Sequence, residues 1–293
     1  MFGILNLEFE SKEMRTIKRT YKAEYRPIAD LITYSPMPTR QLRMIDPFLF
    51  LNHHGPQNYQ PGNNGLPFGP HPHRGMETVT FILDGDIAHK DSGGNNSVIE
   101  SGGVQWMTAG KGLTHAEVSS EKFKKEGGPL EILQLWVNLP ARLKMTDPKY
   151  KGLQKEEIPV TSFENNKVKA QVISGKLNET EGAFETLTDI SLSTIFFEAE
   201  GVFSTRVPQN HNILCYVIKG EIKINGEIIQ SLHLVEFNND DEDLRIEALA
   251  ESIVLFGHAA PFDEPVVAQG PFVMNTVEEI EQAYADYQEG KFE

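Results

Sequence analysis

The stretch Thr78-Val-Thr-Phe-Ile-Leu-Asp-Gly-Asp-Ile-Ala-His89 decides the fold class. Its first six residues are mostly β-branched or aromatic, and such side chains favour strands. Asp84-Gly85 accepts the positive φ angles of a tight turn, and residues 86–89 then resume an extended run. The stretch therefore predicts a β-hairpin.

The rest of the chain follows the same pattern of short apolar runs separated by turn residues. The 24 glycines and 17 prolines interrupt runs rich in Val, Ile, Phe and Thr, where a helical protein would have long segments of 3.6-residue period. Further strands are expected at residues 97–100, 104–108 and 132–138. The chain is therefore predicted to be all-β, except near its end.

The second half repeats the theme of the first. Residues 81–86 (FILDGD) and 216–221 (YVIKGE) look like equivalent turns, which indicates a duplicated β-barrel. A length of 293 residues also suggests two domains. We expect the join between residues 145 and 166, with lobes at 1–148 and 149–293. Thr276 and Glu279 form a capping box that predicts one helix at about 276–289.

Charge and composition exclude several classes of protein. The net charge of −15 disfavours direct binding of nucleic acid, and Lys122, Lys124 and Lys125 are interpreted as a solvated loop. No run of about 18 apolar residues and no basic leader followed by an apolar segment is found, so no membrane association and a cytoplasmic location are expected. The mean hydropathy of −0.35 is that of a globular protein. Cys215, the single cysteine, is interpreted as a buried, inert thiol.

Two short motifs bring metal-binding side chains together. His71-Pro-His73 and His115-Ala-Glu117 each place two such side chains two residues apart, so in an extended strand both point to one face. If the motifs lie on neighbouring strands, three imidazoles and one carboxylate converge. This set contains no thiolate and suits iron, manganese, nickel, cobalt, copper or zinc. We therefore predict one divalent transition metal.

Glu77 is an alternative carboxylate ligand, because an unbroken strand would place it in phase with His73. Two carboxylates and three imidazoles would leave one octahedral position open, whereas Glu117 alone leaves two for substrate and dioxygen. We favour Glu117 as the ligand and Glu77 as a supporting group. Four other expectations concern residues nearby or in the second half. His53 and His54 are expected in a solvated loop, and Trp106 and Trp136 at core positions. Phe68 and Met107 are expected to form an apolar wall, and His211 and His233 to have ordinary polar or core roles.

The sequence resembles the pirin family of the cupin superfamily at RMIDPFLFL (43–51), HPHRGMETV (71–79), QWMTAGKGLTHAE (105–117), LQLWVNLP (133–140) and GPFVMNT (270–276). The resemblance implies a bicupin of two antiparallel β-barrel lobes, each a double-stranded β-helix, with the metal in the N-terminal lobe only. It also implies the ligands His71, His73, His115 and Glu117. The general cupin pattern would instead take its carboxylate from the first motif, where Glu77 lies.

The resemblance further implies a function. Some pirin-like proteins are quercetin 2,3-dioxygenases, so we expect Fe²⁺ as the metal, a flavonol-like aromatic substrate and O2, with Glu117 as the catalytic base. Pirins also include a nuclear partner of transcription factors. The alternative is therefore a non-catalytic, iron-binding redox sensor or regulator that acts through a protein partner.

Overall fold

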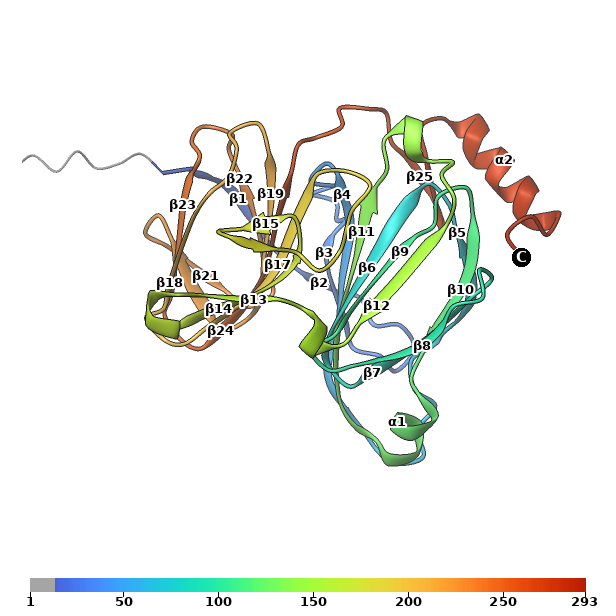
Figure 1. Cartoon of the computed structure of the whole chain (residues 1–293), viewed down its shortest axis with the longest axis horizontal. Coiled ribbons are helices and arrows are strands. Elements are labelled where there is room, and N and C mark those ends of the chain that lie inside the picture. Colours follow the sequence, from blue (N-terminus) through green and yellow to red (C-terminus); the bar gives the residue numbers. More distant parts are fainter. Residues whose placement is uncertain (1–13) are drawn as a thin grey trace, which may run out of the picture.

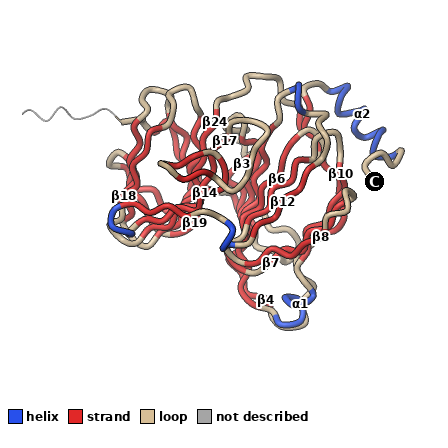
Figure 2. Tube along the Cα trace, viewed as in Figure 1, coloured by secondary structure: helices blue, strands red, loops and turns tan. Residues whose placement is uncertain are grey.

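The computed structural model describes residues 14–293 and consists of two β-lobes that lie side by side (Figure 1). Residues 1–8, where no leader is expected, lie outside the described residues. Each lobe pairs a seven-stranded sheet with a four-stranded sheet, and all of these strand pairs are antiparallel. Strands dominate both lobes, and the helices lie at the periphery (Figure 2). The predicted all-β, two-lobed architecture is confirmed.

The first lobe takes most of its strands from the N-terminal half. Its seven-stranded sheet has the order β12-β9-β6-β11-β4-β3-β2, and its four-stranded sheet has the order β5-β10-β7-β8. The strands are β2 (Glu24–Tyr25), β3 (Thr33–Met37), β4 (Phe48–Tyr59), β5 (Phe68–His73), β6 (Met76–Asp84), β7 (Asp86–Asp91), β8 (Asn96–Glu100), β9 (Val104–Thr108), β10 (Leu113–Val118), β11 (Gly128–Asn138) and β12 (Lys149–Leu153).

The second lobe repeats this plan with the orders β1-β22-β19-β24-β17-β14-β13 and β18-β23-β20-β21. Its strands are β1 (Ile17–Lys22), β13 (Val160–Phe163), β14 (Val168–Ser174), β17 (Ile190–Phe197), β18 (Val202–Arg206), β19 (Asn212–Lys219), β20 (Glu221–Ile224), β21 (Glu227–Gln230), β22 (His233–Phe237), β23 (Asp243–Ala248) and β24 (Ser252–Ala259). Two ribbons complete the strands: β15 (Lys176–Leu177) with β16 (Thr180–Glu181), and β25 (Val267–Gln269) with β26 (Phe272–Met274).

The helices are few and short. They are α1 (Glu121–Glu126), α2 (Val277–Gln288) and the 3-10 turns Ala141–Leu143, Lys155–Glu157 and Glu164–Asn166. The predicted C-terminal helix is confirmed, and its Thr276 and Glu279 form the expected capping box. The three lysines expected in a solvated loop lie in α1, which Ser120 caps. No helix among the described residues is long and apolar enough to cross a membrane.

The predicted hairpin at Asp84-Gly85 is wrong, although both of its strands form. β6 is already paired with β9 and β11, so neither edge is free for β7, which lies in the other sheet. Gly85, with φ +87°, is therefore a corner between two sheets. Gly220, with φ +83°, makes the matching corner between β19 and β20. The equivalence of FILDGD and YVIKGE thus marks two barrel corners.

The three largest parts of the core are as follows. The outer faces of the two seven-stranded sheets pack together through residues such as Val79, Leu135 and Leu214. The interior of the second lobe is mostly apolar and contains Cys215, whose predicted burial is confirmed. The interior of the first lobe is apolar at one end only, around Ile82. Its other end carries polar side chains, and the candidate site lies there.

The chain ends cross between the lobes. β1 pairs with β22 of the second lobe, whereas β26 reaches the first lobe at the Arg74–Phe272 bridge and leads into α2 beside it (Figure 1). β12, which begins at Lys149, pairs with β9 of the first lobe. A division of the chain at residue 148 stays a prediction. β1 lies before this residue but pairs with the second lobe, whereas β12 and β26 lie after it but contact the first lobe.

Candidate metal centre

Three neighbouring strands of the small sheet, β5, β10 and β7, carry the candidate ligands. His115 on β10 lies opposite His71 on β5 and opposite Asp91 on β7. Glu117, two residues further along β10, lies opposite His89 on β7. Because alternate residues of a strand share a face, this register lines the inside of the barrel with imidazoles and carboxylates.

The structure brings His71, His73 and His115 together. One nitrogen of each ring lies within 4.8 Å of the others, and the ring centroids are 4.4–5.0 Å apart. His73 and His115 are each 2% exposed, whereas His71 is half-buried. Burial lowers the pKa of His73 to about 3 and lowers the pKa of His115 as well. Neutral imidazoles are the form that binds metal, so His73 and His115 need lose no proton at neutral pH.

Backbone carbonyls orient two of these rings. His71 Nδ1 donates to Gly69 O at 2.7 Å, and His73 Nδ1 donates to Pro271 O at 3.1 Å. Each ring therefore has its lone pair on Nε2. His73 Nε2 is buried and has no partner among the described residues, and neither has His115 Nδ1. His115 Nε2 lies 3.0 Å from His71 Nε2, so it is this nitrogen of His115 that faces the other two rings. A buried nitrogen without a hydrogen bond is costly, and a metal bound between the three rings would satisfy His73 Nε2.

Glu117 lies in a second group of ligand-type side chains, with His89 and His115, which shares only His115 with the three-histidine cluster. It is 1% exposed, and its oxygens accept hydrogen bonds from Thr80 Oγ1 at 3.0 Å, Gln134 Nε2 at 2.5 Å and Gln105 Nε2. Burial raises its pKa, although nearby imidazoles and these donors oppose the rise. One of its oxygens also lies within 4.8 Å of nitrogens of His89 and His115. Three imidazoles beside a carboxylate form a donor set that fits iron, nickel or another divalent transition metal.

Glu77 does not join this cluster. Gly75, with φ +79°, turns the chain between β5 and β6 and so breaks the phase with His73 on which the alternative ligand depended. Glu77 instead accepts a hydrogen bond from Thr108 Oγ1 at 2.6 Å and lines a cavity of about 430 Å³ with Trp106 and Phe184. This cavity lies on the outer face of the sheet.

Glu77 predicts a pH-dependent stability. Burial raises its pKa from 4.5 to about 7, so the folded chain holds a proton that the unfolded chain has already lost. The free energy of unfolding should therefore fall by up to about 3 kcal/mol as the pH rises from 4.5 to 8. A Glu77→Gln protein cannot lose this proton. Urea unfolding should find it more stable than wild type at pH 8 but not at pH 5, and equal differences at both pH values would contradict the prediction.

The predicted solvated loop at His53 and His54 is wrong, because both residues belong to the central part of β4 and are buried. His53 contacts the Tyr216 hydroxyl at 3.0 Å and Glu131 Oε1 at 2.8 Å, and so links the two lobes. His54 Nδ1 contacts Thr33 Oγ1 at 2.9 Å. The run that leads into these two histidines contains Leu49 and Leu51, whose side chains are buried, and it continues through them as one strand.

Of the two tryptophans, Trp106 packs in the core as predicted, but Trp136 does not. Trp136 is half-buried, stacks on Phe50 with ring centroids 4.6 Å apart and meets His73 edge-on at 5.2 Å. The two residues expected to form one apolar wall lie in different clusters. Met107 is buried beside Leu113, whereas Phe68 is half-buried and packs on His54, with ring centroids 5.2 Å apart.

Three residues of the centre were missed: His89, Asp91 and Tyr150. His89 Nε2 donates to Asp91 Oδ2 at 2.9 Å, and its ring stacks on Tyr150 with centroids 3.9 Å apart. The spacing of His89-Lys-Asp91 equals that of the two motifs already singled out, so the same rule could have found it. Tyr150 carries no such signal, because its place depends on the pairing of β12 with β9.

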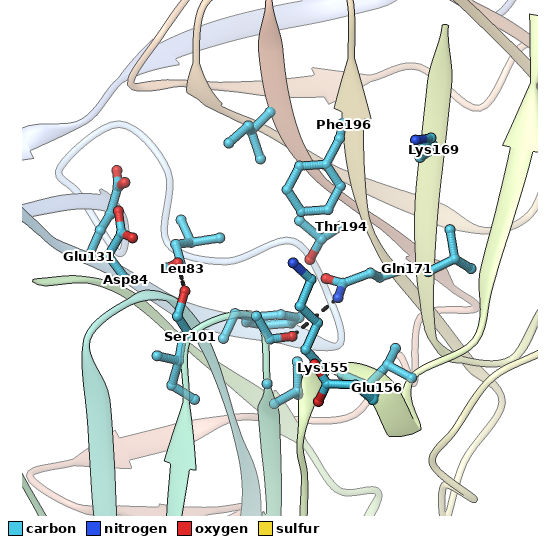
Figure 3. Close-up of a pocket in the computed structure, with 18 of the residues that line it drawn as sticks. Leu83, Asp84, Ser101, Glu131, Lys155, Glu156, Lys169, Gln171, Thr194 and Phe196 are labelled. Atoms are coloured by element: carbon cyan, nitrogen blue, oxygen red, sulfur yellow. Dashed lines mark hydrogen bonds between the residues drawn. The ribbon is translucent and has the colours of Figure 1, made fainter. Parts of the chain in front are cut away.

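A separate cavity lies between the lobes, away from the candidate metal centre. It has a volume of about 650 Å³, and Figure 3 shows Phe196, Lys155 and Gln171 at one side and Asp84 with Glu131 at the other. Its wall residues on β6 and β9 alternate with Thr80 and Gln105, which hold Glu117, so the two sites lie on opposite faces of one sheet. No imidazole lines this cavity.

His211 and His233, expected to be ordinary polar or core residues, lie in the second lobe. His211 Nδ1 is 3.0 Å from His258 Nδ1, and His233 Nδ1 donates to Ser231 O at 3.0 Å. Both groups of three ligand-type side chains that the described residues form lie in the first lobe. A second lobe without metal stays a prediction.

Comparison with known proteins agrees with the fold. The Pirin family model matches residues 30–137, and the model of the Pirin C-terminal cupin domain matches residues 193–293. A Pseudomonas aeruginosa protein named "Putative quercetin 2,3-dioxygenase" is 35% identical over 91% of this chain and 92% of its own length. A pirin-like protein of Caulobacter vibrioides is 37% identical over 87% of this chain and 90% of its own length.

Solved structures lead to the same family. A crystal structure of quercetin 2,3-dioxygenase from Acinetobacter baumannii superposes with a TM-score of 0.90 at 32% identity and covers 96% of this chain and 99% of that one. A bacterial pirin from Escherichia coli in complex with nickel(II) gives a TM-score of 0.67 at 20% identity over 83% and 99% of the two chains, which supports the fold alone. The chain, with its two cupin lobes and a His/Glu cluster in the first of them, therefore belongs to the pirin family.

Proposed function

We propose that this pirin is a metal-dependent dioxygenase that opens flavonols such as quercetin, with Fe²⁺ held by His71, His73, His115 and Glu117. The observation that carries the proposal is a cluster of three imidazoles, two of them buried and neutral, with a buried carboxylate next to His115. The relatives named as quercetin dioxygenases supply the substrate class.

A metal held by these residues would supply Lewis acidity toward the 3-hydroxyl and 4-carbonyl oxygens of a flavonol. Glu117 would accept the proton of the 3-hydroxyl, because its carboxylate lies next to His115 of the cluster. Gln134 and Thr80 hold this carboxylate in place. The half-buried Trp136 beside His73 offers a flat apolar surface to the aromatic rings of the substrate.

The test uses the iron-loaded chain and a panel of flavonols. Mixing under anaerobic conditions followed by a pulse of oxygen should bleach the flavonol absorbance and release one carbon monoxide for each flavonol consumed. A Glu117→Gln protein should lose at least about 100-fold in turnover, the lower range for a general base. Glu77→Gln is the matched control and should keep wild-type turnover. A fully loaded protein that leaves every flavonol intact would refute the dioxygenase.

One contact favours a second function, a metal-dependent regulator that acts on a protein partner. His73 Nδ1 donates to Pro271 O, so a ligand of the centre is joined to the segment that leads into the surface helix α2. A change in the oxidation state of the metal could then alter this surface. Redox-dependent binding of a partner by a protein without turnover would favour this reading.

A further inference from the structure

We propose that the cavity between the lobes binds a small aromatic carboxylate, with Lys155 and Lys169 facing the carboxylate group. This site is separate from the metal centre, because its walls on β6 and β9 lie on the face of the sheet opposite to the one that holds Glu117. A volume of about 650 Å³ suits a small molecule, and a domain boundary is a common place for such a site.

The wall from the second lobe has an apolar centre with polar neighbours. β14 pairs with β17, and β17 pairs with β24, so Lys169, Phe196 and Ile253 lie in one row across three strands. Gln171 and Thr194 form the next row on the same face, two residues away along β14 and β17. An aromatic ring placed on Phe196 and Ile253 would therefore have ammonium, amide and hydroxyl groups at its edge.

The first lobe supplies the facing wall. Phe81 of β6 and Val104 of β9 are buried in the core between the lobes and also line the cavity, and Ile158 joins them from the segment between β12 and β13. The ring would thus have apolar side chains of both lobes around it. A mainly apolar lining with a few placed polar groups is typical of sites for small molecules.

Lys155 and Lys169 supply positive charge. Neither has an ion-pair partner in the part of the chain that the structure describes, although the chain carries 42 acidic residues against 27 Lys and Arg. Glu156 also lines the cavity but forms no ion pair with either lysine. Two unpaired ammonium groups beside apolar walls favour an anionic ligand, because such walls strengthen the electrostatic attraction.

The structure holds Lys155 in position. Its aliphatic stem lies across Gly102, where φ is +83° and a β-carbon would come within 2.7 Å of Lys155 Cδ. Gly102 O accepts a hydrogen bond from Gln171 Nε2 at 3.2 Å, which joins the two lobes at this point. A capping box between Gln154 and Glu157 fixes the turn that contains Lys155. A lysine arranged in advance lowers the entropy cost of binding.

The hydroxyl of Thr194 is a second, independent indication of a ligand. Thr194 is 2% exposed and lines the cavity, yet its hydroxyl makes no hydrogen bond with any described residue. In Figure 3 this hydroxyl and the Lys155 side chain point toward the same part of the cavity. Buried polar groups normally have a partner, and a carboxylate oxygen between Thr194 and Lys155 would provide one.

The charge at the other end limits the ligand to one anionic group. Asp84 and Glu131 are cross-strand neighbours and lie together at that end (Figure 3). Burial, together with the nearby Glu131, raises the pKa of Asp84. Lys219, which also lines the cavity, is already paired with Glu251 at 3.2 Å. A dicarboxylate would place its second charge beside these acids, whereas a monocarboxylate keeps its charge at the end with the free lysines.

The experiment compares compounds that share one ring system and differ in charge. Isothermal titration calorimetry of the full-length protein at neutral pH should show binding of 2-naphthoate. The neutral 2-naphthamide should bind at least about 10-fold more weakly, because it lacks the charge-assisted hydrogen bonds to lysine. The cation 2-naphthylmethylammonium and the dianion 2,6-naphthalenedicarboxylate should also bind more weakly than 2-naphthoate.

Variants then locate the site. Lys155→Gln and Lys169→Gln should each raise the Kd for 2-naphthoate by about 10-fold, and Phe196→Ala should weaken binding of the acid and of the amide. Lys90→Gln is the matched control, because Lys90 is an exposed lysine of β7 without an ion pair among the described residues. It should bind as the wild type does. Thermal unfolding checks that each variant is folded.

A His115→Ala protein separates this site from the metal centre. It should bind 2-naphthoate as the wild type does, with or without added metal. Binding that is lost in this variant, or that needs metal, would place the ligand at the metal centre and overturn the proposal. Equal affinity for acid and amide, or an unchanged Kd in both lysine variants, would overturn it as well. A protein that binds 2-naphthoate but leaves flavonols intact would lose the proposed dioxygenase and keep this site.

Discussion

A His115→Ala protein should lose nearly all of its affinity for divalent transition metals. His115 is the one residue shared by both groups of ligand-type side chains, so its removal breaks the set with His71 and His73 and the set with His89 and Glu117. Outer partners of metal ligands are worth roughly 10- to 100-fold in affinity, so the loss of a shared ligand should exceed about 100-fold. Titration with Fe²⁺ or Ni²⁺ against a chelator measures this directly.

The matched control is His211→Ala, which removes a half-buried histidine of the second lobe. It should bind metal as the wild type does. Thermal unfolding of the metal-free proteins checks that His115→Ala still folds. Wild-type affinity in a folded His115→Ala protein would mean that the ion lies elsewhere, and the centre described above would have to be abandoned.

A Lys144→Ala protein should lose about 3 kcal/mol or more of unfolding free energy. Lys144 is 1% exposed, and its Nζ donates to Gly75 O at 2.9 Å, Asn138 Oδ1 at 2.7 Å and Val273 O at 3.0 Å. Its removal would leave these three acceptors without this donor and open a cavity, and each unsatisfied acceptor costs roughly 1–3 kcal/mol. Urea denaturation at neutral pH measures the loss.

The effect should extend to the metal. Gly75 lies two residues after the ligand candidate His73, and Val273 lies on β26, whose Phe272 forms a β-bridge with Arg74. Through its hydrogen bonds to Gly75 and Val273, Lys144 therefore joins the His71–His73 motif to the C-terminal segment. We expect weaker metal binding as well as lower stability. Lys111→Ala is the control, because its ion pair with Asp147 is exposed and contributes little to stability. Equal losses from both substitutions would disprove the bridging role of Lys144.

Local patterns predicted the strands and the C-terminal helix because both follow from nearest-neighbour chemistry. β-branched runs, turn glycines and the Thr276–Glu279 capping box act over a few residues. The same patterns do not specify which strands pair. Asp84-Gly85 was therefore assigned to a hairpin, whereas the pairing of β6 on both edges makes it a corner. His53 and His54 were misplaced for a related reason, because partners such as Tyr216 lie far away in the sequence.

The sequence by itself determined the β architecture, the resemblance to pirins and a short list of imidazoles and carboxylates, because these depend on residue type and spacing. Only the tertiary structure decided which of them meet. The turn at Gly75 carries the chain from β5 into β6 of the other sheet, so Glu77 points away from the three histidines. The register of β10 with β7 brings His89 and Asp91 beside Glu117. Strand order and register arise from contacts between residues distant in the chain, so no local pattern contains them.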